Sequence, residues 1–168
     1  MSSHAERILW LRALIAFMVL PGLCAGLLPP VLLALDPWRL TEGLPLAGSL
    51  LLAAGLVVLL WCVRDFLAIG RGTLAPWDPP RRLVVVGLYR YMRNPMYVGV
   101  VLIVAALALK DGSPLLGGYA ALLAIVFHVR VVVYEEPALA RQFAGDYAAY
   151  CRKVRRWLPG RPTDRAST

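Results

Sequence analysis

The chain has 168 residues, 60% of them hydrophobic, and a mean hydropathy of +0.66. That length suits one domain, and that hydropathy is far above the usual range of water-soluble domains, so a soluble globular fold is excluded as the default. The formal net charge of +8 would suggest nucleic acid in a soluble protein, but the basic residues stand between and after apolar runs. We therefore interpret them as flanks of membrane spans and expect no nucleic-acid partner.

Four apolar runs predict an all-α, polytopic membrane protein with about four transmembrane helices. The runs cover residues 13–35, 44–63, 96–109 and 115–133. The first two are long enough to cross a hydrocarbon core of about 30 Å at about 1.5 Å per residue. Pro21-Gly22 predicts a kink in the first run. The third run reaches only about 21 Å, so we expect it to form a hairpin with the fourth through a turn at Lys110–Pro114.

Lysine and arginine are distributed unevenly along these segments. Two precede the first run, one follows it, six lie between Arg64 and Arg93, one is Lys110, and eight lie from Arg130 onward. Cytoplasmic segments carry the excess of positive charge, so both termini and the middle loop are predicted to be cytoplasmic. We expect an integral protein of a bacterial inner membrane, in contact with the lipid bilayer.

The segment after the fourth run predicts an amphipathic C-terminal helix over residues 137–150. Its apolar side chains recur at helical spacing: Leu139, Phe143, Tyr147 and Tyr150. We expect this face to lie against the membrane surface. Together with the spans it completes a single membrane domain over residues 1–168.

Cysteine and histidine are too few and too scattered for a disulfide framework or a metal site. Cys24 and Cys62 fall inside apolar runs, where a thiol behaves as a small hydrophobe. His128 has no carboxylate or cysteine at ligand spacing. We expect no metal.

The loop over residues 70–95 contains more glycine, arginine and tyrosine residues than a simple connection between two helices needs. Glycines permit close backbone approach to a ligand, and Arg90 and Arg93 stand one helical turn apart beside Tyr89. Asn94-Pro95 predicts an N-cap and first helical residue for the third span, so that a helix N-terminus suited to a carboxylate faces the loop. The alternative is that these arginines and tyrosines only mark the membrane interface.

A second cluster is Glu135-Glu136, predicted at the cytoplasmic end of the fourth span. Two acidic residues at a helix C-terminus oppose the helix dipole, so they require a compensating cation or ligand. Pairing with loop arginines is one explanation. Hydrogen bonds to the hydroxyl or ammonium groups of a cofactor are the other.

These segments together resemble the isoprenylcysteine carboxyl methyltransferase family and its phospholipid methyltransferase relatives. The resemblance rests on Gly87–Gly99 (GLYRYMRNPMYVG), Glu135-Glu136, Phe143–Tyr147 (FAGDY) and Val154–Pro159 (VRRWLP), in that order. It implies S-adenosylmethionine as cofactor, held between the loop and the last span under the C-terminal helix. The implied cofactor contacts are Leu83, Val84, Tyr89, Asn94, Pro95, Met96, Tyr97 and Glu135. Gly70-Arg71-Gly72 also resembles a Gly-x-Gly of the phospholipid methyltransferases.

The sequence departs from the family pattern at two positions. Asn94 stands where the family commonly has His, and an amide cannot titrate near neutral pH. Arg130 is only an approximate match to the substrate-side Arg that precedes the double Glu. We assign Arg90, Arg93 and Arg130 to positioning a carboxylate or thiolate acceptor. Glu136, with Glu135, is assigned as a base for an amine acceptor.

The predicted function is therefore S-adenosylmethionine-dependent methyl transfer to a lipid-like or isoprenoid acceptor at the cytoplasmic membrane face. One alternative is an NADPH-dependent membrane reductase of the sterol reductase type, and another is a non-catalytic membrane scaffold. Small residues in the second span, such as Gly48 and Gly55, and Gly117-Gly118 in the fourth permit either close helix packing or a homodimer.

Overall fold

The structure is a computed structural model that describes residues 18–40, 42–65 and 83–161. These ranges form helices and contain no β-strand, which confirms the predicted all-α class. In chain order the elements are η1 (Met18–Leu27), α2 (Leu28–Ala34), α3 (Pro45–Asp65), η3 (Gly87–Arg90), α4 (Pro95–Asp111), α5 (Pro114–Arg130), η4 (Val131–Glu135) and α6 (Glu136–Lys153).

Two helical segments in the described ranges are long and apolar enough to cross a membrane. They are α3 and the continuous run Pro114–Lys153, which joins α5, η4 and α6. Pro21–Ala34 is apolar but shorter, and α4 has 17 residues. Residues 13–17 of the first predicted span lie outside the described ranges. The helices are therefore consistent with a membrane protein, while the number of four spans stays a prediction.

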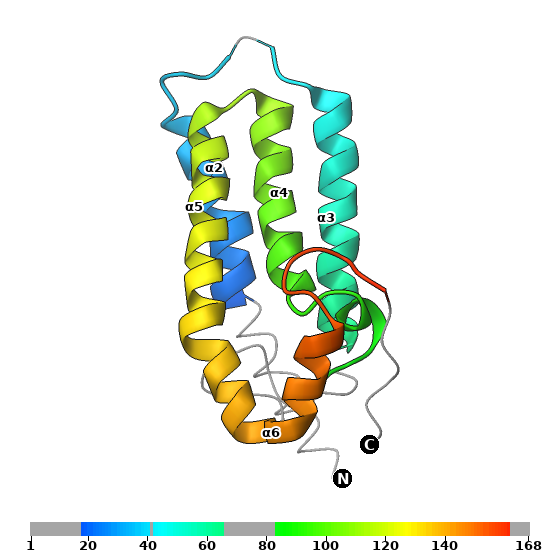
Figure 1. Cartoon of the computed structure of the whole chain (residues 1–168). Coiled ribbons are helices and arrows are strands. Elements are labelled where there is room, and N and C mark those ends of the chain that lie inside the picture. Colours follow the sequence, from blue (N-terminus) through cyan, green and yellow to red (C-terminus); the bar gives the residue numbers. More distant parts are fainter. Residues whose placement is uncertain (1–17, 41, 66–82, 162–168) are drawn as a thin grey trace, which may run out of the picture.

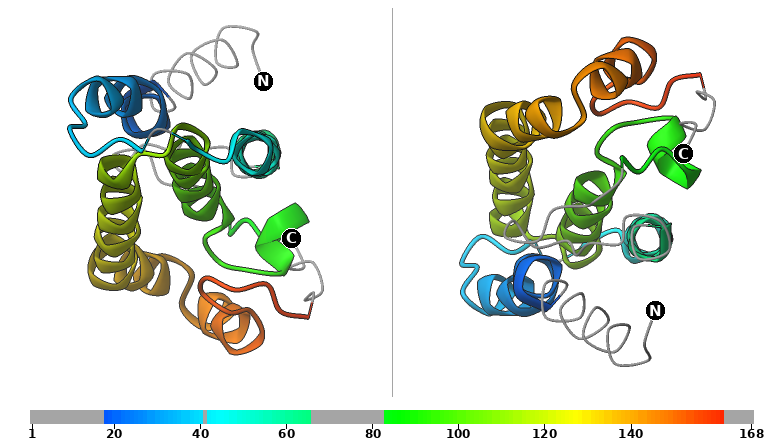
Figure 2. Two further views of the ribbon diagram at one scale, coloured as in Figure 1. Left: turned by 90° about the horizontal axis from the view of Figure 1, so that it is seen from above. Right: turned by 90° about the horizontal axis from the view of Figure 1, so that it is seen from below.

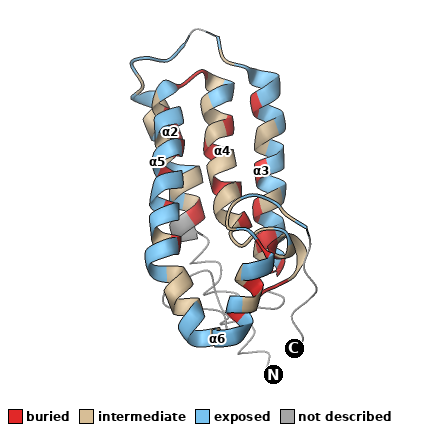
Figure 3. Ribbon diagram, in the orientation of Figure 1, coloured by how far each residue is buried: buried red, intermediate tan, exposed pale blue. Residues whose placement is uncertain are grey.

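Helices α3, α4 and α5 stand side by side, with η1 and α2 packed beside α4 and α5 (Figures 1 and 2). Buried residues line the contacts between helices, and the outward faces are exposed (Figure 3). Those outward faces carry large apolar side chains, including Leu46 and Leu50 on α3 and Ile125 on α5. Such an exposed apolar surface is unsuited to water and suited to lipid.

Glycines bring α3 and α4 into close contact. A Cβ atom at Gly55 would lie 3.0 Å from Ile103 of α4, and one at Gly99 would lie 3.1 Å from the backbone nitrogen of Leu59 of α3. Gly117 of α5, in contrast, has open space around it within the described part of the chain. Close packing, predicted for the small residues of α3, is therefore confirmed there.

The turn between α4 and α5 forms as predicted at Lys110–Pro114. Gly112 adopts the left-handed conformation (φ 62°) and ends α4, and the Ser113 hydroxyl accepts a hydrogen bond from the Leu116 amide at the start of α5. That hydroxyl donates to the Asp36 carboxylate, which also accepts from the Leu115 amide at 3.3 Å. The Ser113 hydrogen bond lowers the pKa of Asp36.

The path after α5 differs from the prediction. The helix does not end near Val133 but continues through the π-helix η4 into α6, so Glu135 and Glu136 lie within a helical path and not at a C-terminus. Pro137 cannot donate to the preceding turn, and it follows directly on the π-helix η4, where the pattern of helical hydrogen bonds changes. The predicted C-terminal helix extends over Glu136–Lys153 and is kinked at Ala144, whose φ is +39°.

The apolar face of α6 packs inward. Tyr147 and Tyr150 are buried against Val85 and Val154, with Leu139 and Phe143 beside them. The expectation that this face lies against the membrane surface is therefore wrong for these side chains. Burying two aromatic rings against the loop removes more apolar surface from solvent than an interfacial position would.

We predict that Gly99→Val destabilises the protein by about 1–3 kcal/mol, because the added methyl groups push α4 away from Leu59 of α3. Unfolding of the purified protein by denaturant in detergent would measure this. The matched control is Gly117→Val, which makes the same change in a helix interior with open space around it. Equal destabilisation by both substitutions would contradict the proposed role of the α3–α4 contact.

Candidate functional site

The site lies at the end of the helical bundle where α3 ends and α4 begins. Here the loop from Leu83 to Asn94, the η4–α6 junction and the C-terminal segment Val154–Gly160 come together (Figure 1). The Arg93 amide donates to the Arg155 carbonyl at 2.9 Å, and the Gly160 amide donates to the Tyr91 carbonyl at 3.0 Å. The C-terminal segment is thus bound along the loop by backbone hydrogen bonds.

Gly87 sets the course of the loop. Its φ is +50°, and a Cβ atom there would overlap the buried Asp65 carboxylate and lie 2.8 Å from Trp61 Nε1. Only glycine satisfies both restrictions. The turn that follows places Tyr89 against Cys62 and Val84, and burial raises the pKa of the Tyr89 phenol.

Tyr150 ties α6 to the loop. Its hydroxyl donates to the Tyr89 carbonyl at 2.6 Å, across a sequence separation of 61 residues. Both rings are buried. Because the hydrogen bond is made in a place shielded from water, it holds α6 at a defined position over Leu83–Tyr89.

Glu136 is held by two arginines from different segments. Arg93 Nη1 of the loop lies 3.1 Å from Glu136 Oε1, and Arg156 of the C-terminal segment binds both carboxylate oxygens, at 2.7 and 2.9 Å. The Arg156 hydrogen bonds, with the nearby Arg93 charge, lower the pKa of Glu136. A single carboxylate therefore joins the start of α6, the loop and the tail.

Glu135 makes a separate cluster with α4 and α5. It accepts a hydrogen bond from the Tyr97 hydroxyl, and Arg130 Nε lies 2.9 Å from the same carboxylate oxygen. Arg130 Nε also lies 3.1 Å from the Tyr97 hydroxyl oxygen. The compensating cations predicted for the Glu135-Glu136 pair are thus Arg130 for Glu135, and Arg93 and Arg156 for Glu136.

Asn94 occupies the N-cap position of α4, and Pro95 follows in the first turn, as predicted. The Asn94 side chain makes no capping hydrogen bond. Its Nδ2 donates instead to the Arg156 carbonyl at 3.2 Å. The predicted N-cap position is therefore confirmed, but Asn94 Oδ1 accepts no amide of α4, and the side chain binds the C-terminal segment through Nδ2.

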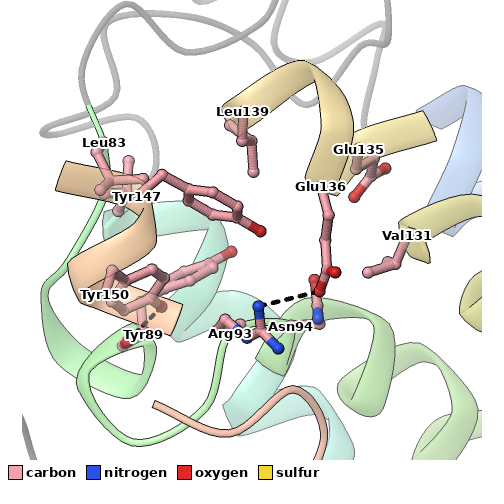
Figure 4. A pocket seen from close by; sticks show the side chains of 11 residues that line it. Leu83, Tyr89, Arg93, Asn94, Val131, Glu135, Glu136, Leu139, Tyr147 and Tyr150 are labelled. Carbon is pink, nitrogen blue, oxygen red and sulfur yellow. Dashed lines mark hydrogen bonds and ion pairs between the residues drawn. The ribbon is translucent and has the colours of Figure 1, made fainter. Parts of the chain in front are cut away.

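A pocket of about 70 Å³ lies between the loop and α6 (Figure 4). Seven of the residues predicted for the site line it: Leu83, Val84, Tyr89, Arg93, Asn94, Glu135 and Glu136. The Arg93 guanidinium faces Glu136 on one side of this space, and the rings of Tyr147 and Tyr150 face it from the other (Figure 4).

The other predicted site residues lie elsewhere. Pro95 is buried at the start of α4, and Met96 packs against the Cys62–Tyr89 cluster. Tyr97 and Arg130 reach the pocket only through Glu135. Arg90 ends η3 and is not among the residues that line the pocket. The Gly70-Arg71-Gly72 motif lies outside the described residues.

Sequence reasoning missed four lining residues and one binding partner. Val131, Leu139, Tyr147 and Tyr150 line the pocket, and Arg156 pairs with Glu136. The helical spacing of the α6 residues predicts an apolar face, but it does not tell whether that face packs against the membrane or against the loop. Nothing local marked Arg156 among the several basic residues of the tail.

Fold and site together define a helical membrane protein with a carboxylate- and arginine-rich pocket where its helices end. The family model for phospholipid methyltransferase matches residues 44–146, from the start of α3 into α6. The chain therefore belongs to the phospholipid methyltransferase family, and is a methyltransferase of the membrane by class. Comparison with curated proteins and with solved structures gave no significant match.

We predict that Glu136→Gln destabilises the protein by about 1.5–3 kcal/mol at neutral pH, because it weakens charged hydrogen bonds to Arg93 and Arg156. The folded-state pKa of Glu136 is lowered, so its contribution is present above its ordinary value of 4.5 and is lost as the pH falls through the lower folded value. Thermal unfolding of both proteins between neutral pH and acid measures the difference.

The matched control for this substitution is Asp146→Asn, which makes the same carboxylate-to-amide change at an exposed position of α6. The stability gap between wild type and Glu136→Gln should narrow as the pH falls below 4.5. A gap that stays constant with pH would contradict a stabilising role of the ionised Glu136.

Proposed function

We propose that this protein transfers a methyl group from S-adenosylmethionine to a lipid-like or isoprenoid acceptor at the cytoplasmic membrane face. Membership of the phospholipid methyltransferase family supports the reaction class. The observation that carries the proposal is the pocket in which Glu135 and Glu136, each paired with arginine, face the aromatic rings of α6.

The chemistry of the pocket residues fits the proposed cofactor. Glu135 or Glu136 can accept hydrogen bonds from its ammonium group, and Arg93 can pair with its carboxylate. Arg93 Nε is buried and has no hydrogen-bond partner in the described part of the chain, so it is a donor ready for a ligand. Tyr147 and Leu139 provide the apolar surface that an adenine ring requires.

The pocket must widen to take the cofactor. Its volume of about 70 Å³ is below the roughly 300 Å³ from which ligand pockets begin. One wall is α6, whose kink at Ala144 separates the lining residues Leu139 and Tyr147. We infer that this part of α6 moves away from the loop when the cofactor enters.

When bound, S-adenosylmethionine supplies a methyl group already activated by its sulfonium centre. The protein then has to orient the acceptor and exclude water, so a strong base is not essential. Arg130, fixed beside Tyr97 and Glu135, can orient a carboxylate or thiolate. For an amine acceptor, Glu135 or Glu136 would take the proton. For Glu136 the hydrogen bonds from Arg156 and the charge of Arg93 lower the pKa and so oppose this step.

The binding of S-adenosylhomocysteine tests this assignment. We predict that Glu135→Gln weakens binding about tenfold or more, because an uncharged amide oxygen binds an ammonium group and Arg130 more weakly than a carboxylate does. Isothermal titration calorimetry measures the affinity, and Asp146→Asn on the exposed side of α6 is the matched control.

Three results would count against the proposal. Unchanged affinity of Glu135→Gln would remove Glu135 from the cofactor site. Saturable binding of NADPH without binding of S-adenosylhomocysteine would favour the reductase. Absence of any thermal stabilisation by saturating S-adenosylhomocysteine would favour the scaffold, since a ligand that binds the folded state raises the melting temperature.

A further inference from the structure

A second cavity, separate from the pocket, lies between α4 and α5. It has a volume of about 430 Å³ and is a groove walled by apolar side chains, among them Val98 and Val101 of α4 and Ile125 of α5. At one end the Tyr97 ring packs against Phe127 with 4.5 Å between centroids. We call this cavity the α4–α5 groove.

The groove and the pocket meet at Tyr97. The ring of Tyr97 lines the groove, and its hydroxyl donates to Glu135, which lines the pocket. A molecule whose apolar part occupied the groove would therefore have its polar end beside Tyr97, Glu135 and Arg130. This continuity relates the groove to the proposed methyl transfer.

Trp157 of the C-terminal segment forms one wall of the groove. Its indole N–H donates to His128 Nδ1 of α5 at 3.1 Å, and the two ring centroids are 6.0 Å apart. An indole nitrogen can only donate, so His128 Nδ1 is the acceptor in this contact. Trp157 also packs against the core cluster that contains Phe127.

The residue before Trp157 is connected to the other cavity through Glu136. Arg156 binds Glu136, which lines the pocket, while Trp157 binds His128, which lines the groove. Two consecutive residues of the C-terminal segment thus bind one lining residue of each cavity. Both contacts help to set the position of this segment.

A hydrocarbon chain is the occupant that the groove favours. Beside the groove, the outward face of α5 exposes Leu122, Ile125, Val126 and Val129. In a bilayer this face is covered by lipid chains. The walls offer few polar groups that could satisfy a peptide backbone or a sugar, whereas a hydrocarbon chain needs none. The groove volume lies within the range of about 300–1,000 Å³ for small-molecule sites.

We propose that the α4–α5 groove holds one hydrocarbon chain of the acceptor lipid, and that Trp157, fixed by His128, determines which chain shapes fit. This inference rests on the proposed methyl transfer only in naming the bound lipid as the methyl acceptor. The groove, its occupant and the role of Trp157 rest on the geometry. Removing the indole would widen the groove at Trp157 and relax discrimination between straight and branched chains.

Photo-crosslinking of the full-length protein tests the occupant. The probe is a palmitic acid analogue with a diazirine in its chain, applied in detergent micelles and followed by peptide mass spectrometry. Groove residues such as Val101 and Ile125 should be labelled, and excess palmitate should suppress the labelling. Labelling spread evenly over exposed apolar residues such as Leu50 of α3, without competition, would overturn the proposal.

A groove-filling variant gives a second measure of occupancy. Val101→Trp places a large ring inside the groove. It should reduce the labelling that excess palmitate suppresses about tenfold. The matched control, Leu50→Trp, adds the same ring to an exposed face of α3 and should leave labelling unchanged. Equal labelling of both variants would overturn the groove as the binding place.

The role of Trp157 is tested by the ratio of labelling between the palmitic acid probe and a branched, farnesyl-type diazirine probe. Trp157→Ala should change this ratio about fivefold or more, because about 1 kcal/mol separates chains that fit a shaped apolar wall from those that do not. Trp157→Phe should change the ratio less, and Trp38→Ala, at an exposed position, not at all. An unchanged ratio in Trp157→Ala would remove Trp157 as the determinant.

S-adenosylhomocysteine affinity, measured on the same proteins, separates the two proposals. We expect the control Leu50→Trp to bind it as tightly as wild type. Competed groove labelling in a wild-type protein that does not bind S-adenosylhomocysteine would contradict the methyltransferase assignment alone. Cofactor binding without competed labelling would contradict the groove alone.

Discussion

The ion pairs of Glu136 are the interaction on which the arrangement of the site depends. Its carboxylate joins the loop through Arg93 and the C-terminal segment through Arg156, and it stands at the start of α6. Since two cations converge on one half-buried anion, the three segments are brought together at a single point. The backbone hydrogen bonds between loop and tail then fix their register.

Close packing of α3 on α4 sets the position of the loop that forms the site. Gly55 and Gly99 allow the two backbones to approach, and the end of α3 therefore meets the loop that leads into α4. Gly87 completes this arrangement because only glycine fits beside Asp65 in that conformation. The polar site is thus built on a rigid helix pair, as a site that must orient two reactants requires.

Two cavities of different character are linked by hydrogen-bonded side chains. The pocket between the loop and α6 is lined by two carboxylates and Arg93 as well as by aromatic rings. The α4–α5 groove is lined almost entirely by apolar side chains. Tyr97, Arg130 and Glu135 connect them from the helices, and Arg156-Trp157 connects them from the tail. This division suits a reaction between a polar cofactor and a lipid, the kind of reaction that the phospholipid methyltransferase family name implies.

The sequence by itself determined the helical class, the turn at Lys110–Pro114, the start of α4 at Pro95 and the family, because these depend on composition, local spacing and short motifs. The tertiary structure decided which partners the polar groups choose. Asn94 binds the Arg156 carbonyl, and Tyr150 binds the Tyr89 carbonyl, across separations of 62 and 61 residues. The inward face of α6 was decided in the same way. Such contacts depend on how distant helices pack, and no local pattern encodes that packing.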